Sequence, residues 1–203
     1  PFGKLSKTAV MGKILITGGA GFIGLNLIKH LYKKKNKIYV IDLPKKIKKY
    51  KKELNRCILI PGNIENKNLF EKVDKKIDTI YHLAANSITE NTPSKGKREK
   101  WFNNLNVGGT KNLLESMEAN GVKEMAFISS DMVYGSPRQI PIKVDHPLEP
   151  NGPYGQSKKE AENLVTDFGA NEEHRTIIFR PRMIVGPGRW GIIKKLFFFI
   201  KNS

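Results

Sequence analysis

The feature that most constrains the fold is a glycine-rich turn between an apolar strand and a helix. The strand-like run KILIT (13–17) leads directly into GGAGFIG (18–24), and a helical pattern follows. In such a turn Gly18 permits a tight bend, Gly21 lets a pyrophosphate approach the backbone, and Gly24 allows close helix–sheet packing. The helix N-terminus then offers amide groups and a positive dipole end to phosphates. The pattern predicts a pyrophosphate-binding strand–turn–helix unit; the alternative is a turn that is merely tight.

Strands and helices alternate through the rest of the chain. We expect further strands over 37–42, 57–62, 79–85, 125–130 and 175–181, and helices over 22–34, 103–120 and about 154–169. Alternation of this kind is typical of βαβ units and a mostly parallel sheet. We therefore predict an α/β fold, a Rossmann-type doubly wound parallel sheet with helices on both faces. With 203 residues, the chain has room for one such domain.

The predicted second strand ends at Asp42, which indicates the kind of dinucleotide. A carboxylate at this place accepts hydrogen bonds from the adenosine ribose and repels a 2′-phosphate. Neither the glycine loop nor the segment directly after Asp42 contains an arginine that would bind such a phosphate. NAD is therefore favoured over NADP. Lys45 and Lys46 are close enough in sequence to offset part of the carboxylate charge.

The chain is strongly basic, with a formal net charge of +17 and a pI near 9.9. Such a charge raises the possibility of a nucleic-acid partner. However, the lysines are spread over many segments, and the densest run, KKIKKYKK (45–52), is typical of a solvated helix or loop face. Interleaved aromatic residues and a known reading motif are both missing. We therefore expect no nucleic-acid partner.

Cysteine and histidine usage excludes several kinds of site. Cys57 is the only cysteine and lies in an apolar run, so we interpret it as a structural thiol in a reducing compartment. The histidines do not combine into a metal-ligand spacing; they are His30, His82, His146 and His174. No segment has the length of a membrane span or the pattern of a signal peptide. The expectation is a soluble, cytoplasmic protein without a metal or membrane partner.

A tyrosine and a lysine stand four residues apart in PYGQSKKEAE. On a helix this spacing places Tyr154 and Lys158 on one face, in successive turns. A nearby ammonium favours phenolate over phenol, which lowers the pKa of a tyrosine from about 10 and suits it to act as a general base. The helix follows a strand that ends in Ser129 and Ser130, at the edge where open α/β sheets bind ligands. The alternative for the spacing alone is an ordinary amphipathic helix.

Six segments occur in the order found in one enzyme family. They are ITGGAGFIG (16–24), YHLAA (81–85), NLNVGGTKNLL (104–114), SSDMVYG (129–135), PYGQSK (153–158) and FRPRMIVGPG (179–188). With them the chain resembles an extended short-chain dehydrogenase/reductase of the NAD-dependent epimerase/dehydratase family. The resemblance runs from about residue 12 to 190, and the ordered set is far more specific than any single segment.

The resemblance implies an enzyme with a catalytic triad of Ser130, Tyr154 and Lys158. Tyr154 would take a proton from a substrate hydroxyl as hydride passes to the nicotinamide. Lys158 would hold the nicotinamide ribose and depress the pKa of Tyr154. The implied cofactor is NAD, bound by Gly18, Gly21, Phe22, Ile23, Gly24, Asp42, Asn63, Ile64, Leu83, Ala84, Ala85, Ser129, Tyr154, Lys158 and Pro181.

Several of these positions have a more specific implied role. Asn63 and Ile64 would flank the adenine, although the family often has aspartate where this chain has Asn63. The segment 83–85 would line the cofactor groove. Asn106 matches a family asparagine on the helix beneath the active site, and Pro181 would approach the carboxamide through its backbone.

The same resemblance points to four substrate positions. Asp131 matches the acid of nucleotide-sugar 4,6-dehydratases, but Met132 stands where those enzymes place a glutamate base, which disfavours 4,6-dehydration. In many sugar epimerases an asparagine that contacts the diphosphate stands where this chain has Met183. Arg182 could supply a phosphate contact instead, because a guanidinium matches phosphate geometry.

The domain boundaries follow from these segments. Residues 1–11 are expected to be an extension or a cloning remnant, 12–190 the NAD-binding Rossmann domain, and 191–203 the start of a truncated substrate-binding lobe. The apolar stretch that begins at Ile192 would favour dimerisation or aggregation if left bare. The resemblance also implies a homodimer through helices 103–120 and 154–169.

Three functions follow, in order of preference. The first is an NAD-dependent epimerase or oxidoreductase that acts on a nucleotide-sugar hydroxyl by tyrosine-assisted hydride transfer. The second is the same chemistry on a non-sugar secondary alcohol, such as a hydroxysteroid-, flavonol- or threonine-like compound. The third is a non-catalytic NAD-binding module.

Overall fold

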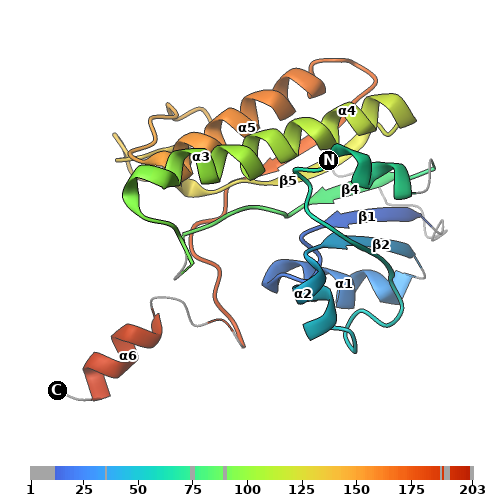
Figure 1. Cartoon of the computed structure of the whole chain (residues 1–203). Helices are drawn as coiled ribbons and strands as arrows, with labels where there is room; N and C mark the ends of the chain where they lie inside the picture. The colour runs from blue at the N-terminus through green and yellow to red at the C-terminus, as the bar shows by residue number, and fades with distance from the viewer. Residues whose placement is uncertain are drawn as a thin grey trace.

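A six-stranded parallel sheet forms the centre of the molecule (Figure 1). The computed structural model describes residues 12–34, 36–73, 76–88, 91–187, 189 and 193–201, and the side chains of all these except 193–196. The strands are β1 (Lys13–Thr17), β2 (Lys37–Asp42), β3 (Ile58–Pro61), β4 (Thr79–His82), β5 (Glu124–Ile128) and β6 (Arg175–Phe179). Their order is β3-β2-β1-β4-β5-β6, and every pairing is parallel. The predicted α/β, Rossmann-type doubly wound fold is confirmed.

The strand order places a crevice at one edge of the sheet. The chain runs outward from β1 to β3 on one side and from β4 to β6 on the other, so the order reverses between β1 and β4. These two strands pair from Ile14 with Thr79 to Thr17 with His82. Open α/β sheets bind ligands beyond the carboxyl ends of the strands at such a switch point. The glycine loop and the segment 83–85 therefore lie where a ligand is expected.

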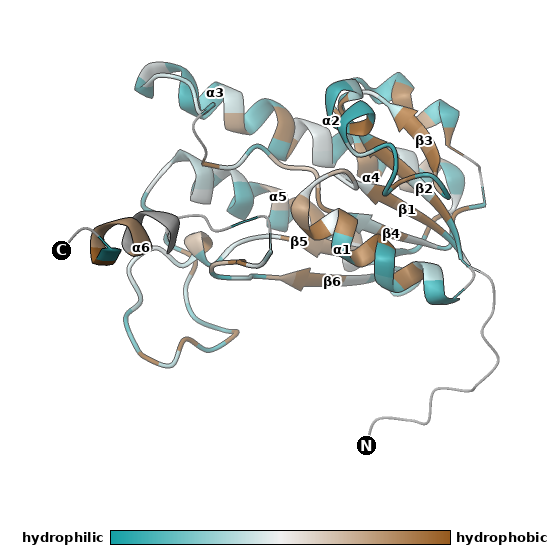
Figure 2. Ribbon diagram, turned by 90° about the horizontal axis from the view of Figure 1, so that it is seen from below, coloured by the Kyte–Doolittle hydropathy of each residue, from teal (hydrophilic) through white to brown (hydrophobic). Residues whose placement is uncertain are grey.

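Helices cover the two faces of the sheet with separate cores. The helices α1 (Phe22–Leu31) and α2 (Pro44–Lys49) lie on one face, and α3 (Arg98–Phe102), α4 (Thr110–Asn120) and α5 (Pro153–Gly169) lie on the other (Figure 1). Since side chains alternate along a strand, Ile14 and Ile16 pack toward α1 while Leu15 packs toward α4 and α5. Burial on both faces explains why the central strands are mostly apolar (Figure 2).

The helix expected over 103–120 is longer and interrupted. It begins at Arg98 as α3, passes through the π-helix η4 (Asn103–Gly109) and continues as α4. The interruption lies where the backbone comes close to the core, since a Cβ at Gly109 would lie 2.6 Å from Ile64 Cδ1. π-Helical turns inside α-helices are frequent at functional sites. Gly121 ends α4 in the left-handed conformation, which glycine adopts readily.

The last three strands end before the residues we expected. β4 ends at His82 rather than residue 85, β5 at Ile128 rather than residue 130, and β6 at Phe179 rather than residue 181. Single backbone hydrogen bonds continue past these ends, from the Ser129 N–H to the Phe179 carbonyl and from the Asp131 N–H to the Pro181 carbonyl, but the regular ladder stops. The apolar pattern continues beyond the hydrogen-bonded ladder, so it could not mark these ends.

The lysine run and the single cysteine occupy the environments we expected. In α2 the lysines are exposed and Ile47 is buried. Cys57 is half-buried, and its Sγ lies 3.1 Å from the hydroxyl of Tyr32. Burial raises the pKa of the Cys57 thiol, which keeps it protonated. In the described part of the chain, no group of histidine, cysteine and acidic residues could hold a metal.

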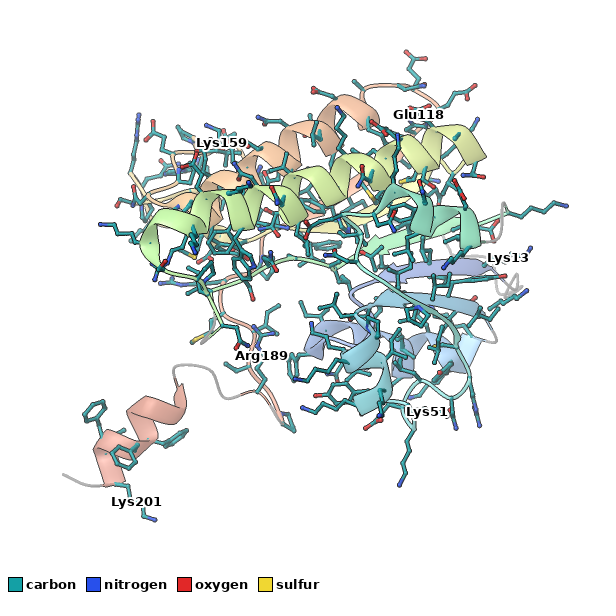
Figure 3. All side chains as sticks on the ribbon, in the orientation of Figure 1. Lys13, Lys51, Glu118, Lys159, Arg189 and Lys201 are labelled. Carbon is teal, nitrogen blue, oxygen red and sulfur yellow. The ribbon has the colours of Figure 1, made fainter. Side chains whose placement is uncertain are left out.

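The C-terminal helix α6 (Ile193–Lys201) stands apart from the sheet and its covering helices (Figures 1 and 3). Its side chains from Phe197 to Ile200 are all exposed. Among the described residues, no helix is both long and apolar enough to cross a membrane. The expected boundaries at residues 11 and 191 lie outside the described residues.

A matched pair of valines tests the core beneath α5. Val165 is completely buried and Val144 is 88% exposed. We expect Val165→Ala to lower the free energy of unfolding by about 2 kcal/mol, through lost burial and an unfilled cavity. Val144→Ala is the control and should change it by less than about 0.5 kcal/mol. Urea unfolding measures both; equal effects would contradict the assigned core.

Candidate functional site

The glycine loop fits tightly against the chain that follows β4. Gly18 has a φ of +73°, and a Cβ on it would lie 2.7 Å from the backbone nitrogen of Ala84. Its own N–H donates to the carbonyl of Ile41 at 2.8 Å. Only glycine combines this conformation with this close approach. The loop is therefore held between β2 and the segment 83–85.

The start of α1 leaves amide groups available to a phosphate. Gly21 is the N-cap of this helix, and no side chain caps it. The first amides of a helix have no partner within the helix, so they can bind an anion. On the other side, a segment after β6 passes close by: Phe22 packs against Gly186, and the guanidinium of Arg189 lies 5.7 Å from its ring centroid. The site thus fits the pyrophosphate of a dinucleotide.

Asp42 lies beside this loop at the end of β2 and is almost fully buried. Its carboxylate accepts hydrogen bonds from the N–H of Ala20 at 2.9 Å and of Leu43 at 2.8 Å. Burial raises the pKa of Asp42, while the Lys46 ammonium, 3.9 Å away, and these N–H groups oppose the rise. Asp42 therefore braces the glycine loop and retains lone pairs for ribose hydroxyls. The ribose contact of Asp42 was expected from the sequence, but its hydrogen bond with the Ala20 N–H was not.

The residues expected around the adenine have different surroundings. Asn63 folds back on its own turn, donating to Glu65 Oε1 at 2.9 Å and accepting from the Glu65 N–H. The Ile64 side chain lies in the core, where it meets Gly109. Any contact of Ile64 with adenine must therefore come from its backbone.

Ser130 and Tyr154 lie at the carboxyl end of β5. Ser130 caps the short 3-10 helix η5 (Asp131–Val133): its hydroxyl accepts from the Met132 N–H at 3.3 Å and donates to Asp131 Oδ1 at 3.3 Å. Ser130 is also close enough to Tyr154 to lower the pKa of that phenol. The Tyr154 ring packs on Phe102 of α3, with ring centroids 5.4 Å apart. The structure thus places two of the three residues of the predicted triad at the same end of β5.

The pKa of Tyr154 moves in the direction opposite to our expectation. Burial raises it, the Ser130 hydroxyl opposes this rise, and charges on Asp131 and Arg189 act with smaller and opposite effects. The expected lowering by Lys158 is wrong for this structure. The Lys158 Nζ donates to the carbonyl of Ile128 at 2.8 Å and lies 4.0 Å from the Phe127 ring centroid. The Lys158 ammonium therefore contacts β5. The four-residue spacing on the helix could not predict this contact.

Lys158 itself has an unusual environment. It is 1% exposed, and burial lowers its pKa to about 7, with the nearby Glu162 carboxylate opposing the shift. The Glu162 carboxylate accepts a bidentate pair of hydrogen bonds from Arg180, with Nε 3.0 Å from Oε1 and Nη2 2.7 Å from Oε2. The same guanidinium donates to the Tyr134 hydroxyl at 3.0 Å. This pair of a buried carboxylate and a partly buried guanidinium ties α5 to the segment after β6.

The four expected substrate positions lie together on the same edge. Met132 and Met183 are exposed, at 44% and 55%. The Asp131 carboxylate lies 3.7 Å from Arg182 Nε, and its backbone N–H donates to the Pro181 carbonyl at 3.1 Å. Segments from β5 and β6 are therefore joined in front of Ser130. Ser129, beside it, is buried, and its hydroxyl makes no hydrogen bond within the described part of the chain.

Comparison with known proteins identifies the family of this chain. The model of the NAD dependent epimerase/dehydratase family matches residues 14–198. The chain belongs to that family. Its UDP-glucose 4-epimerase relative from Lactobacillus helveticus is 35% identical over 156 residues, which are 75% of this chain and 46% of the relative.

Solved structures agree with this membership. The UDP-Glc/GlcNAc 4-epimerase of Campylobacter jejuni superimposes with a TM-score of 0.72 at 32% identity, covering 83% of this chain and 53% of that one. The NAD complex of UDP-glucose 4-epimerase from Brucella ovis has a TM-score of 0.72 at 26% identity, covering 83% and 51%. The chain thus spans about half the length of the curated relatives it matches. NAD is the cofactor of this family, as Asp42 indicated.

Two sets of polar contacts around the site were not predicted from the sequence. The ion pair of Glu162 and Arg180 was not predicted from the sequence, although Glu162 stands four residues after Lys158, the spacing that also separates Tyr154 from Lys158. The hydrogen bonds of His82 were missed as well, because spacing could exclude a metal site but could not identify hydroxyl partners on distant segments.

The close contact of the glycine loop predicts the effect of a single methyl group. Gly18→Ala should destabilise the fold by about 2 kcal/mol or more, because the left-handed conformation and the clash with Ala84 are both unfavourable. It should also abolish measurable NAD binding. Gly96→Ala is the matched control, since a Cβ there meets nothing within 4 Å. Thermal unfolding and NAD titration measure both effects; unchanged NAD affinity in Gly18→Ala would contradict the assigned loop.

The environment of Lys158 predicts how stability depends on pH. An unfolded lysine holds its proton up to about pH 10.5, whereas the pKa of Lys158 in the fold is about 7. Between these values folding releases a proton, so stability rises with pH through this window and is lowest below pH 7. Lys158→Met should make the urea-derived stability curve flatter between pH 7 and 10. Lys111→Met removes an exposed lysine and is the control; equal slopes in wild type and Lys158→Met would contradict the buried ammonium.

Proposed function

We propose that this chain forms the cofactor-binding and catalytic part of an NAD-dependent epimerase of nucleotide sugars. The observation that carries the proposal is that Ser130, at the start of η5, and Tyr154, at the start of α5, lie at the sheet edge that also holds the glycine loop, with Ser130 lowering the pKa of Tyr154. Relatives named UDP-glucose 4-epimerase, at 34% to 36% identity, support the substrate class.

The residues that would hold NAD lie along the carboxyl edge of the sheet. The amides after Gly21 would bind the pyrophosphate, Asp42 would accept from the ribose, and the segment 83–85 would flank the groove. When bound, NAD supplies a nicotinamide that takes up hydride from the substrate carbon and returns it. Further contacts are assigned to Gly18, Phe22, Ile23, Gly24, Asn63, Ile64, Ser129, Tyr154, Lys158 and Pro181.

Tyr154 would move the proton of the reacting hydroxyl. Its Oη accepts that proton as the hydroxyl carbon is oxidised, and donates it back when the carbonyl is reduced. Ser130 lowers the pKa of Tyr154 and so favours the phenolate, while Phe102 packs against the Tyr154 ring. Burial acts against the phenolate, and the positive charge of Arg189 opposes this effect of burial.

Lys158 would assist this proton transfer through its positive charge. Its ammonium is fixed by the Ile128 carbonyl and the Phe127 ring, and the charge of Glu162 favours the protonated form. A protonated Lys158 supplies a donor and a positive charge on the floor of the site. Its contact with the nicotinamide ribose, implied by the family, remains part of this proposal.

Two positions favour epimerisation over dehydration. Met132 occupies the place where 4,6-dehydratases have a glutamate base, and a thioether cannot abstract a proton. Met183 replaces an asparagine typical of many sugar epimerases, which leaves Arg182 as the candidate for the phosphates of the substrate. Because Met183 is apolar, a non-sugar secondary alcohol is the second candidate substrate.

The assigned base gives a direct test. Tyr154→Phe should lower the interconversion of UDP-glucose and UDP-galactose by at least about 100-fold, because it removes the group that moves the proton. NAD affinity, measured by titration calorimetry, should change little. Tyr50→Phe, at the C-cap of α2, is the matched control. Normal turnover in Tyr154→Phe would show that another group is the base; wild type that binds NAD without turnover of any nucleotide sugar would contradict the proposed activity.

A further inference from the structure

His82 is a buried titratable residue that the proposed chemistry does not use. It is the last residue of β4, is 1% exposed, and lies between β1 and the helices on the far face. Its Nδ1 is 2.6 Å from Thr17 Oγ1 and its Nε2 is 2.9 Å from Thr110 Oγ1. Both threonines are fully buried. A single imidazole therefore joins the strand before the glycine loop to the start of α4.

The neighbours of the threonines fix where each proton lies. Thr110 Oγ1 donates to the carbonyl of Asn106 at 2.6 Å, so its only proton is committed. It can only accept from His82, which places a proton on Nε2. A neutral ring then has a bare Nδ1, which must accept the proton of Thr17. Thr17 Oγ1 in turn accepts the N–H of Ala84 at 3.3 Å. The hydrogen bonds thus run in one defined order.

The environment keeps this imidazole neutral. Burial lowers the pKa of His82 to about 3, and the charge of Lys158 acts in the same direction. The ring lies against Phe127, with centroids 5.3 Å apart, so the face toward β5 offers no anion to stabilise an imidazolium. The neutral ring donates on one side and accepts on the other, as the two threonines require.

Each end of this series reaches a different part of the site. At one end, Thr17 precedes Gly18, and Ala84 lines the groove beside it. At the other end, the Asn106 amide donates to Ser157 Oγ at 2.9 Å, and that hydroxyl donates to the Tyr154 carbonyl at 2.8 Å.

We infer that His82 is a positioning residue: a neutral, Nε2-protonated imidazole that couples the backbone of the cofactor groove to the helix start that carries Tyr154. The inference rests on the proposed function only in calling the groove a cofactor groove. His82 touches neither the reacting atoms nor Tyr154 itself, so its effect passes through Thr17 and Thr110. A histidine that only fills the core would not need this proton arrangement.

Nitrogen-15 NMR of the whole chain tests the proton arrangement without any cofactor. We expect one histidine to remain neutral down to pH 4, with a slowly exchanging proton on Nε2. His82→Gln, which removes this residue, assigns the signal by its loss. A His82 ring that carries its proton on Nδ1, or that becomes charged near pH 6.5, would overturn the inference, whatever the fate of NAD binding.

Matched threonine variants test the coupling. Thr110→Val keeps the shape of the side chain and removes the acceptor of His82, so NAD affinity should fall about tenfold although Thr110 lies on α4. Thr110→Ser keeps the hydroxyl and should restore wild-type affinity and the Nε2 proton signal. Thr166→Val, at an exposed site of α5, is the control. If Thr110→Val does not fold, Thr17→Ser and Thr17→Val serve as the pair.

The outcomes separate this inference from the proposed function. Loss of affinity in Thr110→Val and its rescue in Thr110→Ser support the coupling. Equal NAD affinity in wild type and a folded Thr110→Val would overturn it while leaving NAD binding intact. Wild type that does not bind NAD would contradict the proposed function, and the NMR measurement would still decide the proton arrangement.

Discussion

The site depends on the contact between the glycine loop and the chain that leaves β4. At Gly18 the two backbones are so close that a Cβ would lie 2.7 Å from the Ala84 nitrogen. This contact forms the floor of the crevice between β1 and β4, where the order of the strands reverses. It also brings Thr17 next to Ala84 and sets the position of α1 and its free amides. The contact therefore defines both the floor and the phosphate end of the crevice.

Burial of ionisable groups is the second physical theme. Asp42, His82 and Lys158 are each less than one-tenth exposed, and desolvation is the largest cause of each pKa shift. Each group has hydrogen-bonding partners that compensate for the loss of water. Such polar groups are fixed in place, since any movement would leave a donor or acceptor without a partner. The site gains rigid geometry from groups that would be mobile on a surface.

The residues predicted for the site lie at one edge of the sheet, and most of their contacts could not be predicted from the sequence. Spacing on a helix identified Tyr154 and Lys158, and the strand end identified Ser130. Spacing could not show that the Lys158 ammonium points to β5, nor that the pKa of Tyr154 is raised by burial. Those facts depend on residues far away in the sequence. The same limit applies to Asp42, whose contact with the Ala20 amide appears only once loop and strand are folded together.

By itself the sequence determined the order of elements, the parallel sheet and the glycine turn, because these follow from local period and from residues with special backbone freedom. It also indicated NAD through one carboxylate at a strand end. Only the tertiary structure decided the ends of β4, β5 and β6, the π-helical turn, the pair of Glu162 and Arg180, and the partners of His82. These features arise where segments distant in sequence meet in a low-dielectric interior, and no local pattern records which groups will meet there.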